Sequence, residues 1–519
     1  MESPFSRVVQ TGRAIGPTSI IEYVVFSFGV FVLLIVFNIV WQFLPRRKSE
    51  PPTVFHWFPF IGNAISYGTD PCDFMIKNRK KYGDIYSFTM FGSKTTVYLG
   101  IAGNEFILNG KISDLNAEEI YAPLCTPVFG SGVVYDCPNA KFMEQKKFVK
   151  FGLTQTALES HVRLIEAEVL AYIKTSPSLK GPRGTVDVST SMAQITIFTA
   201  GRTLQGAEVR SKLTNEFAKL YHDLDNGFQP INFLIPWAPL PQNRRRDRAH
   251  TKMRGIYMDI ISARRARGAR LEEEEPDMLW NLMGCVYKDG EPIGDKEIAH
   301  MMITLLLGGQ HSSSSAGAWI LLHLAARPDI ADELFREQQG LGEELEYADI
   351  ERMPLMQAVV KETLRLRSSI HSIMRMVKSP MSVPGTEFVI KPGRAVLASP
   401  AVTHLDGSYF ANPYVWDPHR WDSRVETETE EDLVDYGYGA VSKGTRSPYL
   451  PFGGGRHRCI GEGFAYVNLC TIVATLVRNF RFSTLDGKPT LPPTDYTSLF
   501  SMPTRPAVIR WEGRFPKEG

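Results

Sequence analysis

The clearest feature of the hydropathy pattern is an uncharged apolar run near the start of the chain. Residues Tyr23 to Leu44 are 22 consecutive positions without Asp, Glu, Lys or Arg. As an α-helix this run would measure about 33 Å, enough to cross the ~30 Å hydrocarbon core of a bilayer. We therefore expect one transmembrane helix at residues 23–44.

The charges on either side of this run predict its orientation. Arg46, Arg47 and Lys48 follow it directly, whereas residues 1–22 carry two acidic and two basic side chains that sum to zero. By the positive-inside rule, residues 1–22 lie on the lumenal side and the body of the chain lies in the cytosol. A cleaved signal peptide is the alternative, but the length of the run and the lack of a basic segment or a small-residue cleavage motif argue against it.

After the apolar run the pattern predicts a hinge and one long domain. Pro45, Pro51 and Pro52 stiffen the hinge at residues 45–53. Residues 54–519 contain no internal repeat, and we expect them to form a single catalytic domain on the cytosolic side.

Short strand-like segments in this domain predict a small β lobe. Thr95–Leu99, Glu387–Ile390 and Ala395–Ala398 have the composition of strands, and most other periodic segments have the spacing of helices. The expected fold class is therefore mainly α with a small β lobe. The apolar segment Trp57–Asn63 follows the anchor closely and either dips into the membrane or packs at the start of the core.

The longest helical pattern of the domain is Lys296–Arg327. Asp295 is placed to cap it and Pro328 to end it. Its centre, Met301–Leu307, is apolar on every side, which predicts burial. The segment Gly308-Gly309-Gln310-His311-Ser312-Ser313-Ser314-Ser315 then interrupts the pattern. Neighbouring glycines permit a kink or a widened turn that forms a groove, and close helix packing is the alternative.

Composition narrows the class of protein. The chain has 519 residues, 43% of them hydrophobic, enough for a large core. Its net charge of +2 argues against a nucleic-acid partner. The six cysteines form no C-x-x-C pair, which indicates a body in a reducing compartment. The basic run Arg264–Arg270 and the acidic block Glu272–Glu275 are expected on solvated loops or helix ends, with partner binding as the alternative.

Candidate chemistry is concentrated in Phe452-Gly453-Gly454-Gly455-Arg456-His457-Arg458-Cys459-Ile460-Gly461-Glu462. A cysteine among cationic residues before a helix gains thiolate character, and a lone thiolate suits haem iron better than zinc. The spacing F-x-x-G-x-(R/H)-x-C-x-G resembles the haem-binding signature of the cytochrome P-450 family, with His457 where many members have Arg. This implies the cytochrome P-450 fold, haem b as cofactor and Cys459 as the thiolate ligand of its iron. A buried structural cysteine beside a glycine turn is the alternative.

Three more residues resemble a structural pattern of the same family. Glu362 and Arg365 are three positions apart and share one helix face, as in the family's buried E-x-x-R pair. Arg420 would be the third member of this network. The neighbouring His419 and Trp421 depart from the usual P-E-R-F sequence, and we expect this departure to weaken the network without changing the fold.

Two long segments narrow the resemblance to one branch of the family. They are Tyr121-Ala122-Pro123-Leu124-Cys125-Thr126-Pro127-Val128-Phe129-Gly130 and Tyr221-His222-Asp223-Leu224-Asp225-Asn226-Gly227-Phe228. Both resemble segments of the sterol 14α-demethylases, the fungal ones most closely, as do Gly309–Ser313 and His371–Arg375. With the anchor and the cysteine loop, the resemblance covers nearly the whole chain.

This resemblance implies contacts for haem and for a sterol. The haem propionates would be held by Tyr121, Tyr135, Lys146, Arg375 and His457, with Lys147 as the adjacent alternative to Lys146. An apolar cavity would accept a rigid sterol with few polar groups. The residues expected to line it are Leu124, Thr126, Phe129, Phe228, Pro230, Phe233, Ala299, Met302, Leu305, Leu306, Gly309, Ile373, Leu499 and Phe500.

The resemblance also implies a path for protons. Many cytochromes P-450 use an acid and an alcohol on the central helix, where this chain has His311 and Ser312. Asp225 would lie opposite His311, and we expect its carboxylate to raise the pKa of the imidazole, so that the pair shuttles protons from bulk water. A core histidine with satisfied hydrogen bonds is the alternative.

The implied reaction is three successive oxygenations of the 14α-methyl group of lanosterol or eburicol, with loss of formic acid, in ergosterol synthesis. Oxygen and electrons from NADPH would be used, the latter through NADPH–cytochrome P-450 reductase. Lys141, Lys146, Lys147, Lys150 and Arg458 would form its docking surface, with an ordinary solvated face as the alternative.

The resemblance further implies a single-pass protein of the endoplasmic reticulum membrane to which azole inhibitors bind. Two other functions remain open at this point. One is another membrane-bound P-450 hydroxylase acting on fatty acids or xenobiotics, and the other is a haem- or sterol-binding protein without turnover.

Overall fold

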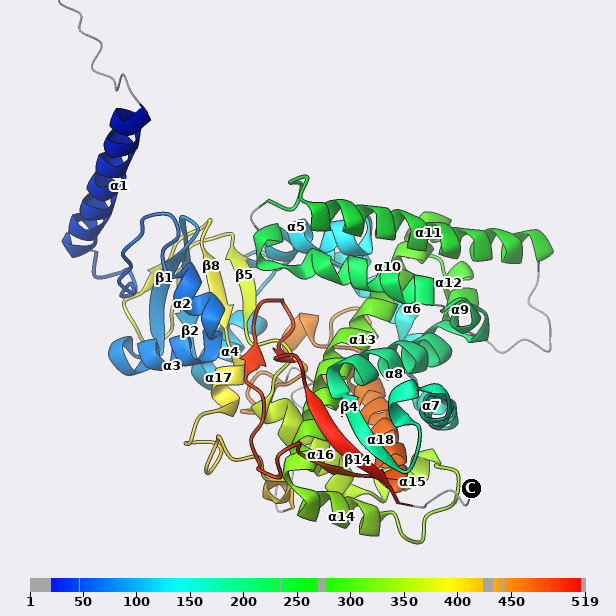
Figure 1. The fold of residues 1–519 in the computed structure, drawn as a ribbon. Coiled ribbons are helices and arrows are strands. Elements are labelled where there is room, and N and C mark those ends of the chain that lie inside the picture. Colours follow the sequence, from blue (N-terminus) through cyan, green and yellow to red (C-terminus); the bar gives the residue numbers. More distant parts are fainter. Residues whose placement is uncertain are drawn as a thin grey trace, which may run out of the picture.

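Helices form most of the body, and a smaller β lobe lies between them and the N-terminal helix α1 (Ile20–Phe43) (Figure 1). The structure is a computed structural model that describes residues 20–45, 47–213, 215–233, 235–268, 277–422, 433–438, 440–442 and 444–514. The expected fold class, mainly α with a small β lobe, is confirmed.

One long helix, α13 (Asp295–Ala326), runs through the middle of the body (Figure 1). Nearly all of its side chains from Ile298 to Ala325 are buried, as its apolar centre predicted. Gly294 is the residue before the helix, so Asp295 is not its cap but part of its first turn, where free amides favour a carboxylate. Pro328 begins the next helix directly.

The remaining helices surround α13 or build the β lobe. They are α2 (Ala64–Thr69), α3 (Pro71–Tyr82), α4 (Gly100–Leu108), α5 (Glu118–Phe129), α6 (Asn139–Val149), α7 (Gln155–Thr175), α8 (Val188–Ala200), α9 (Ala207–Lys212), α10 (Asn215–Asp225), α11 (Pro241–Arg267), α12 (Met278–Met283), α14 (Pro328–Glu337), α15 (Tyr347–Glu351), α16 (Pro354–Leu366), α17 (Pro400–His404) and α18 (Glu462–Asn479).

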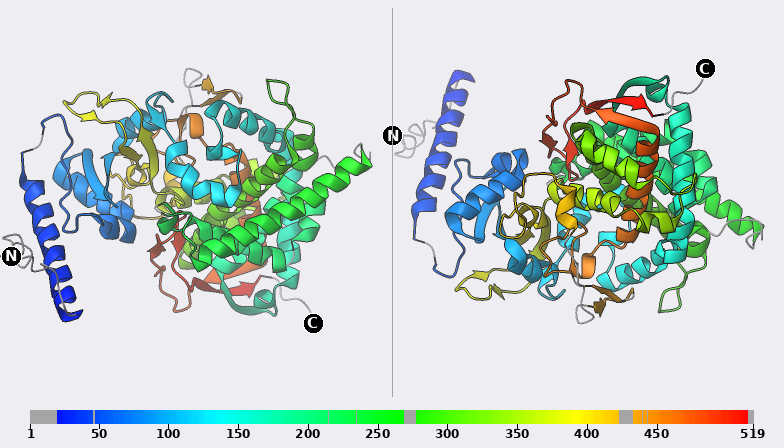
Figure 2. Two further views of the ribbon diagram at one scale, coloured as in Figure 1. Left: turned by 90° about the horizontal axis from the view of Figure 1, so that it is seen from above. Right: turned by 90° about the horizontal axis from the view of Figure 1, so that it is seen from below.

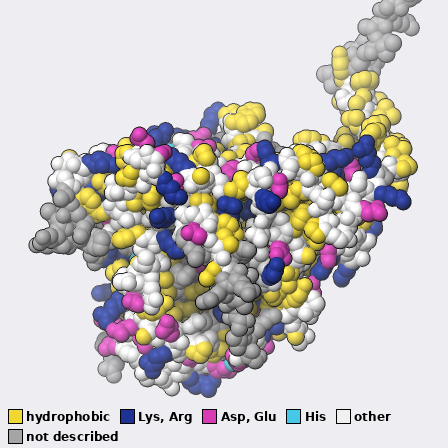
Figure 3. Space-filling view, turned by 180° about the vertical axis from the view of Figure 1, so that it is seen from behind, with side chains coloured by type: hydrophobic (Ala, Val, Ile, Leu, Met, Phe, Trp, Pro, Cys, Tyr) yellow, Lys and Arg dark blue, Asp and Glu magenta, His cyan; other side chains and the backbone are white. Residues whose placement is uncertain are grey.

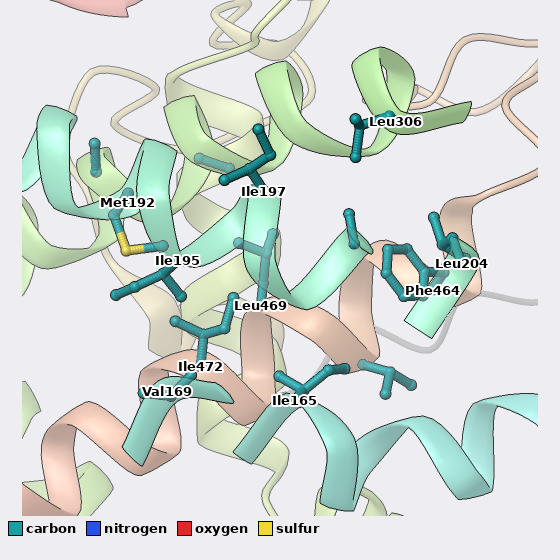
Figure 4. Close-up of a cluster of buried hydrophobic side chains, with 14 of the residues drawn as sticks. Ile165, Val169, Met192, Ile195, Ile197, Leu204, Leu306, Phe464, Leu469 and Ile472 are labelled. Carbon is teal, nitrogen blue, oxygen red and sulfur yellow. The ribbon is translucent and has the colours of Figure 1, made fainter. Parts of the chain in front are cut away.

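The main core lies where α7, α8, α13 and α18 meet (Figure 4). These helices contribute aliphatic side chains that are almost completely buried, and each such side chain stabilises the fold by about 1.5–3 kcal/mol relative to an exposed position. The side chains labelled in the close-up are Ile165, Val169, Met192, Ile195, Ile197, Leu204, Leu306, Phe464, Leu469 and Ile472. This core holds α13 and α18 in fixed positions relative to each other.

The β lobe is built on a five-stranded sheet in the order β1-β2-β8-β5-β3. β2 and β8 are parallel, and the other neighbouring pairs are antiparallel. The strands of the protein are β1 (Ile85–Met90), β2 (Ser93–Tyr98), β3 (Leu115–Asn116), β4 (Arg183–Asp187), β5 (Ile373–Val377), β6 (Met381–Ser382), β7 (Val389–Ile390), β8 (Ala395–Ala398), β9 (Leu433–Asp435), β10 (Ala440–Ser442), β11 (Phe480–Ser483), β12 (Thr494–Asp495), β13 (Met502–Pro503) and β14 (Val508–Gly513). All three predicted strands are present, although β7 is shorter than expected.

Helix α1 stands clear of the body at one edge of the molecule (Figure 2), and its surface is largely apolar (Figure 3). The portion Tyr23–Phe43 is long and apolar enough to cross a membrane and is not buried, so α1 is a candidate membrane anchor. Its last turns hold the following segment, because Asn38 Nδ2 and Gln42 Nε2 donate hydrogen bonds to the carbonyl of His56 at 3.0 and 2.8 Å.

The apolar segment after the anchor is at the surface. Trp57 and Phe60 are each 62% exposed, whereas Asn63 at its end is buried. Phe58 stacks on Phe31 of α1, with ring centroids 6.3 Å apart. The segment therefore lies beside the candidate anchor and does not pack into the core.

Arg264, Arg265 and Arg267 lie in the last turn of α11, at a helix end as expected. Arg264 is nevertheless buried, and its guanidinium pairs with Glu208 and Asp277, both at 2.8 Å. Two carboxylates offset the cost of burying one cation. Arg265 pairs with Asp295, and the block Glu272–Glu275 lies outside the described residues.

Deletion of residues 1–44 is expected to release the protein from membranes and leave the body folded. The described hydrogen bonds between α1 and the body join Asn38 and Gln42 to the backbone of His56 and Trp57, so their loss removes no core contact. Membrane sedimentation and far-UV circular dichroism check both parts.

A truncated protein that fails to fold would contradict this prediction. Sedimentation with membranes that persists after truncation would implicate the exposed Trp57 and Phe60. The double variant Trp57→Ser, Phe60→Ser in the truncated chain tests that cause directly.

Candidate active site

Backbone contacts fix the shape of the cysteine loop and its position against the β lobe. Within the loop, Cys459 N–H donates to the carbonyl of Phe452 at 3.0 Å, and Arg458 N–H to that of Gly455 at 3.0 Å. Gly455 has a φ of 64°, and a Cβ there would lie 2.2 Å from the carbonyl oxygen of Leu108 at the end of α4. Only glycine permits this approach, which explains the glycine-rich sequence before the cysteine.

The Cys459 side chain retains exposed surface, although protein surrounds its thiol. Burial raises the pKa of the Cys459 thiol, and the backbone of Gly461 with the cations of Lys146 and Arg458 act in the opposite direction. Coordination to a metal ion would remove the proton outright. Among the described residues no cluster of three His, Cys, Asp or Glu side chains that could hold a metal ion exists.

Helix α13 has an accessible stripe in its otherwise buried middle. Gly308 is exposed, and Leu305 and Ser312 are half-buried, with spacings of three and four residues that place them on one face. Gly309 is also half-buried, four positions after Leu305, but a Cβ there would meet Leu204 at 3.3 Å and Ala200 at 3.7 Å. Gly308 has no such neighbours and is the more open of the two glycines.

Two buried cations lie near the cysteine loop. Lys146 of α6 donates from Nζ to the carbonyls of Arg456 and Arg458 at 3.1 and 3.0 Å, and burial lowers its pKa to about 8. Arg375 of β5 donates to the carbonyl of Met374 at 2.8 Å. No carboxylate in the described part of the chain pairs with either cation. Lys147, the alternative to Lys146, is exposed.

Three aromatic residues complete this cluster. The rings of Tyr121 and Tyr135 are 5.1 Å apart, and Tyr135 is 6.0 Å from His457. Tyr121 Oη accepts the backbone N–H of Met374 at 3.0 Å. Val134 has a φ of 53°, a strained conformation for a β-branched residue, and this turn sets the position of Tyr135.

The cluster has free hydrogen-bonding capacity. His457 Nδ1 is buried without a partner, and burial, followed by Arg375, Lys146 and Arg456, lowers the pKa of His457 well below its usual value. Burial also raises the pKa of Tyr121 and Tyr135, so both hydroxyls remain donors.

These residues fit haem. Two propionates would supply the negative charge that the two buried cations lack, and the hydroxyls and the imidazole would donate hydrogen bonds to them. The thiol at Cys459 is a suitable axial ligand. The structure thus brings together all six residues that the sequence analysis assigned to haem.

The predicted proton gate is assembled, but its electrostatics differ from the expectation. His311 Nε2 lies 3.2 Å from Asp225 Oδ1, although the angle is not that of a hydrogen bond. Phe500 stacks on the His311 ring at 5.1 Å, and Tyr221 lies 5.3 Å away. Asp225 acts to raise the pKa of His311, as expected, but burial is the larger cause and the net pKa is lowered. Asp225 is 36% exposed and remains in contact with solvent.

The predicted cavity residues divide into two groups. Half-buried or exposed residues have surface to offer a ligand: Thr126, Phe129, Phe233, Leu305, Ile373, Leu499 and Phe500. Leu124, Phe228, Ala299, Met302 and Leu306 are at most 1% exposed and are packed in the core, as Figure 4 shows for Leu306. These five buried side chains support the residues around them and do not themselves offer surface to a ligand. The side chain of Pro230 lies outside the described part of the chain.

The predicted charge network is complete, with Glu362 and Arg365 fully buried and Arg420 half-buried. Glu362 contacts Arg365 at 2.8 Å and Arg420 at 2.9 Å. Trp421 Nε1 donates to the same carboxylate at 3.1 Å, and so does the backbone N–H of Asp417 at 3.0 Å. The expected weakening is therefore wrong, because the indole at position 421 adds a donor.

The predicted reductase-docking cations are mostly engaged within the protein. Lys146 points into the cysteine loop, Lys141 pairs with Glu297 at 2.9 Å, and Arg458 pairs with Glu462 at 2.9 Å. Lys150 donates to the carbonyl of Tyr438 at 3.4 Å. Lys147 is the exposed member of the set.

Comparison with known proteins agrees with this geometry. A model of the cytochrome P450 family matches residues 51–511. The solved structure "Retinoic acid bound cyanobacterial CYP120A1" superposes with a TM-score of 0.74 over 90% of this chain and 100% of that one, at 20% identity, which supports the fold.

Curated relatives match along nearly their whole length. "Sterol 14-alpha demethylase CYP51A" of Gibberella zeae is 63% identical over 93% of this chain and 96% of its own. "Sterol 14-alpha demethylase cyp51A" of Aspergillus fumigatus is 61% identical, with 92% and 95% covered. "Eburicol 14-alpha-demethylase" of Penicillium italicum is 59% identical, with 97% and 98% covered. The chain therefore belongs to the cytochrome P450 family, within its branch of fungal sterol 14-alpha demethylases.

Proposed function

We propose that the protein is a haem-thiolate monooxygenase that removes the 14α-methyl group of lanosterol or eburicol in ergosterol synthesis. The observation that carries this proposal is the accessible Cys459 thiol beside the buried cations Lys146 and Arg375, with which no carboxylate of the described residues pairs. The substrate class follows from relatives that are 59–63% identical and are named for sterol or eburicol demethylation.

Binding of haem is assigned to the cluster around the cysteine loop. Haem with a thiolate ligand activates molecular oxygen for insertion into C–H bonds. Cys459 supplies the thiolate. Lys146, Arg375, His457, Tyr121 and Tyr135 hold the propionates, and charge-assisted hydrogen bonds of this kind are about twice as strong as neutral ones.

The sterol is assigned to the hollow lined by the accessible stripe of α13. Leu305 and Gly308 lie on this stripe, and Phe129 and Ile373 contribute apolar surface from α5 and β5. Apolar walls stabilise a hydrocarbon ligand by about 25 cal/mol per Å² of surface removed from water, and they exclude water from the reacting carbon. Glycine at position 308 leaves room for the ring system.

Proton transfer is assigned to Asp225, His311 and Ser312. The Asp225 carboxylate is open to solvent, and it takes protons from bulk water. His311 is neutral at rest because its pKa is lowered, so its imidazole is free to accept a proton and pass it on. Ser312, on the accessible stripe, supplies the hydroxyl nearest the hollow.

The remaining assignments concern the membrane and the electron donor. Residues 1–22 lie in the lumen, residues 23–44 span the endoplasmic reticulum membrane, residues 45–53 form the hinge, and residues 54–519 form the cytosolic domain. NADPH–cytochrome P-450 reductase delivers electrons on the cytosolic side, and Lys147 belongs to its docking surface. Azole inhibitors bind in the same hollow as the sterol.

The proposal predicts demethylated sterol as the product when the purified protein, the reductase and NADPH are incubated with lanosterol or eburicol. Gas chromatography with mass spectrometry detects it, along with one formic acid per turnover. Hydroxylated fatty acid without demethylated sterol would instead indicate a different P-450 hydroxylase. No NADPH-dependent product from any of these substrates would indicate a binding protein.

Cys459→Ala is expected to abolish thiolate ligation, because it removes the thiol of the cysteine loop. The reduced carbon monoxide complex should lack the red-shifted Soret band that thiolate ligation produces. Cys470→Ala is the matched control, since Cys470 is a fully buried cysteine of α18 away from the loop. A normal band in the Cys459 variant would contradict the assignment of the ligand.

Asp225→Ala and His311→Ala are each expected to reduce demethylation about tenfold or more, with much smaller effects on sterol affinity. The double variant should be little slower than either single variant, because residues that act as one unit are not additive. Turnover and the sterol-induced shift of the haem spectrum measure the two quantities.

Asp223→Ala is the control on the same helix, where the carboxylate approaches Arg245 at 3.6 Å instead. Equal losses of affinity and rate in the Asp225 and His311 variants would make the pair structural. Additive losses would show that the two residues act separately.

A further inference from the structure

A buried histidine outside the clusters described so far contacts the chain just before the cysteine loop. His404 is the last residue of α17 and has no exposed surface. Its Nε2 accepts the backbone N–H of Leu450 at 2.8 Å, and its Nδ1 lies 3.2 Å from Ser368 Oγ. An amide N–H only donates, so Nε2 carries no proton and Nδ1–H donates to the serine.

Helix α16 fixes this histidine from the other side. Ser368 Oγ donates onward to the carbonyl of Leu364 at 3.2 Å. Arg365 Nη1 donates to the carbonyl of His404 at 2.8 Å, while its other nitrogens hold Glu362. The imidazole is thus bound, through its ring and its backbone, to the helix that carries the buried charge network.

The bond to Leu450 is transmitted to the cysteine by two further backbone bonds. Leu450 C=O accepts the N–H of Gly453 at 3.2 Å, and Phe452 C=O accepts the N–H of Cys459 at 3.0 Å. The ring of Tyr449, next to Leu450, lies 5.5 Å from the His404 ring. The position of the cysteine amide therefore depends on where His404 holds the start of the loop.

We propose that His404 is a positioning residue for the thiolate: its neutral imidazole couples the Glu362–Arg365 network to the loop that presents Cys459 to iron. The inference rests on the proposed haem ligation. The imidazole stays neutral because burial, followed by Arg365, lowers the pKa of His404 to about 3. Protonation of Nε2 would remove the only acceptor that the Leu450 amide has in the described structure.

The test compares His404→Gln with His404→Met. These side chains have nearly the same size, but only glutamine offers an oxygen to accept the Leu450 N–H. His323→Met is the matched control, because His323 is also buried, 5% exposed, and stacks on Trp416 away from the loop. Two measurements are made on the full chain: amide hydrogen exchange of peptides that contain Leu450, and the stability of the red-shifted Soret band.

The proposal predicts about tenfold faster exchange at Leu450, and about tenfold faster loss of the red-shifted band, in His404→Met than in the wild type. His404→Gln should recover most of both. His323→Met should lower the melting temperature without a selective effect on either measurement.

Two results would overturn the proposal. One is unchanged exchange at Leu450 in His404→Met. The other is faster exchange with a band as stable as in the wild type or in His323→Met. A failure of the proposed haem ligation is distinguishable from a failure of this inference. In the former case Cys459→Ala would keep its red-shifted band. The amide exchange at Leu450 does not involve the cysteine ligand and so tests the role of His404 separately.

Discussion

The structure depends on a carboxylate that has no contact with water. Glu362 is fully buried, and an ionised carboxylate in that position destabilises the fold by several kcal/mol unless donors surround it. Its donors are Arg365 on its own helix and Arg420, Trp421 and Asp417 N–H from a segment more than fifty positions away. Satisfying one charge therefore fixes that segment against α16, and His404 extends the same constraint to the cysteine loop.

The cation cluster beside the cysteine loop, unlike Glu362, has buried charges without partners of opposite sign among the described residues. Lys146 and Arg375 are buried without carboxylates among the described residues, which is costly for the protein by itself. The cost is offset when an anionic group enters, so the site favours a cofactor with two carboxylates over a neutral one. Before such a group binds, the stability contributed by the helical core and the Glu362 network offsets the cost of burying these two cations.

Helix α13 combines burial with access. Most of its length stabilises the core, and the stripe at Leu305, Gly308 and Ser312 faces open space. His311 lies next to Ser312 but on a different face, between the rings of Tyr221 and Phe500. The helical period thus separates the face of His311, which lies beside the solvent-exposed Asp225, from the accessible stripe that we propose binds the sterol.

By itself the sequence predicted the fold class, the family and a candidate anchor, because each depends on local spacing or a short motif, and from the same motifs we proposed the cysteine ligand and the haem and gate residues. Tertiary structure decided what those patterns left open. Gly308 is more open than Gly309, since Leu204 and Ala200 approach the latter. Burial, not Asp225, sets the pKa direction of His311. Trp421 strengthens the charge network because its indole meets Glu362, a contact between residues 59 positions apart that no local pattern encodes.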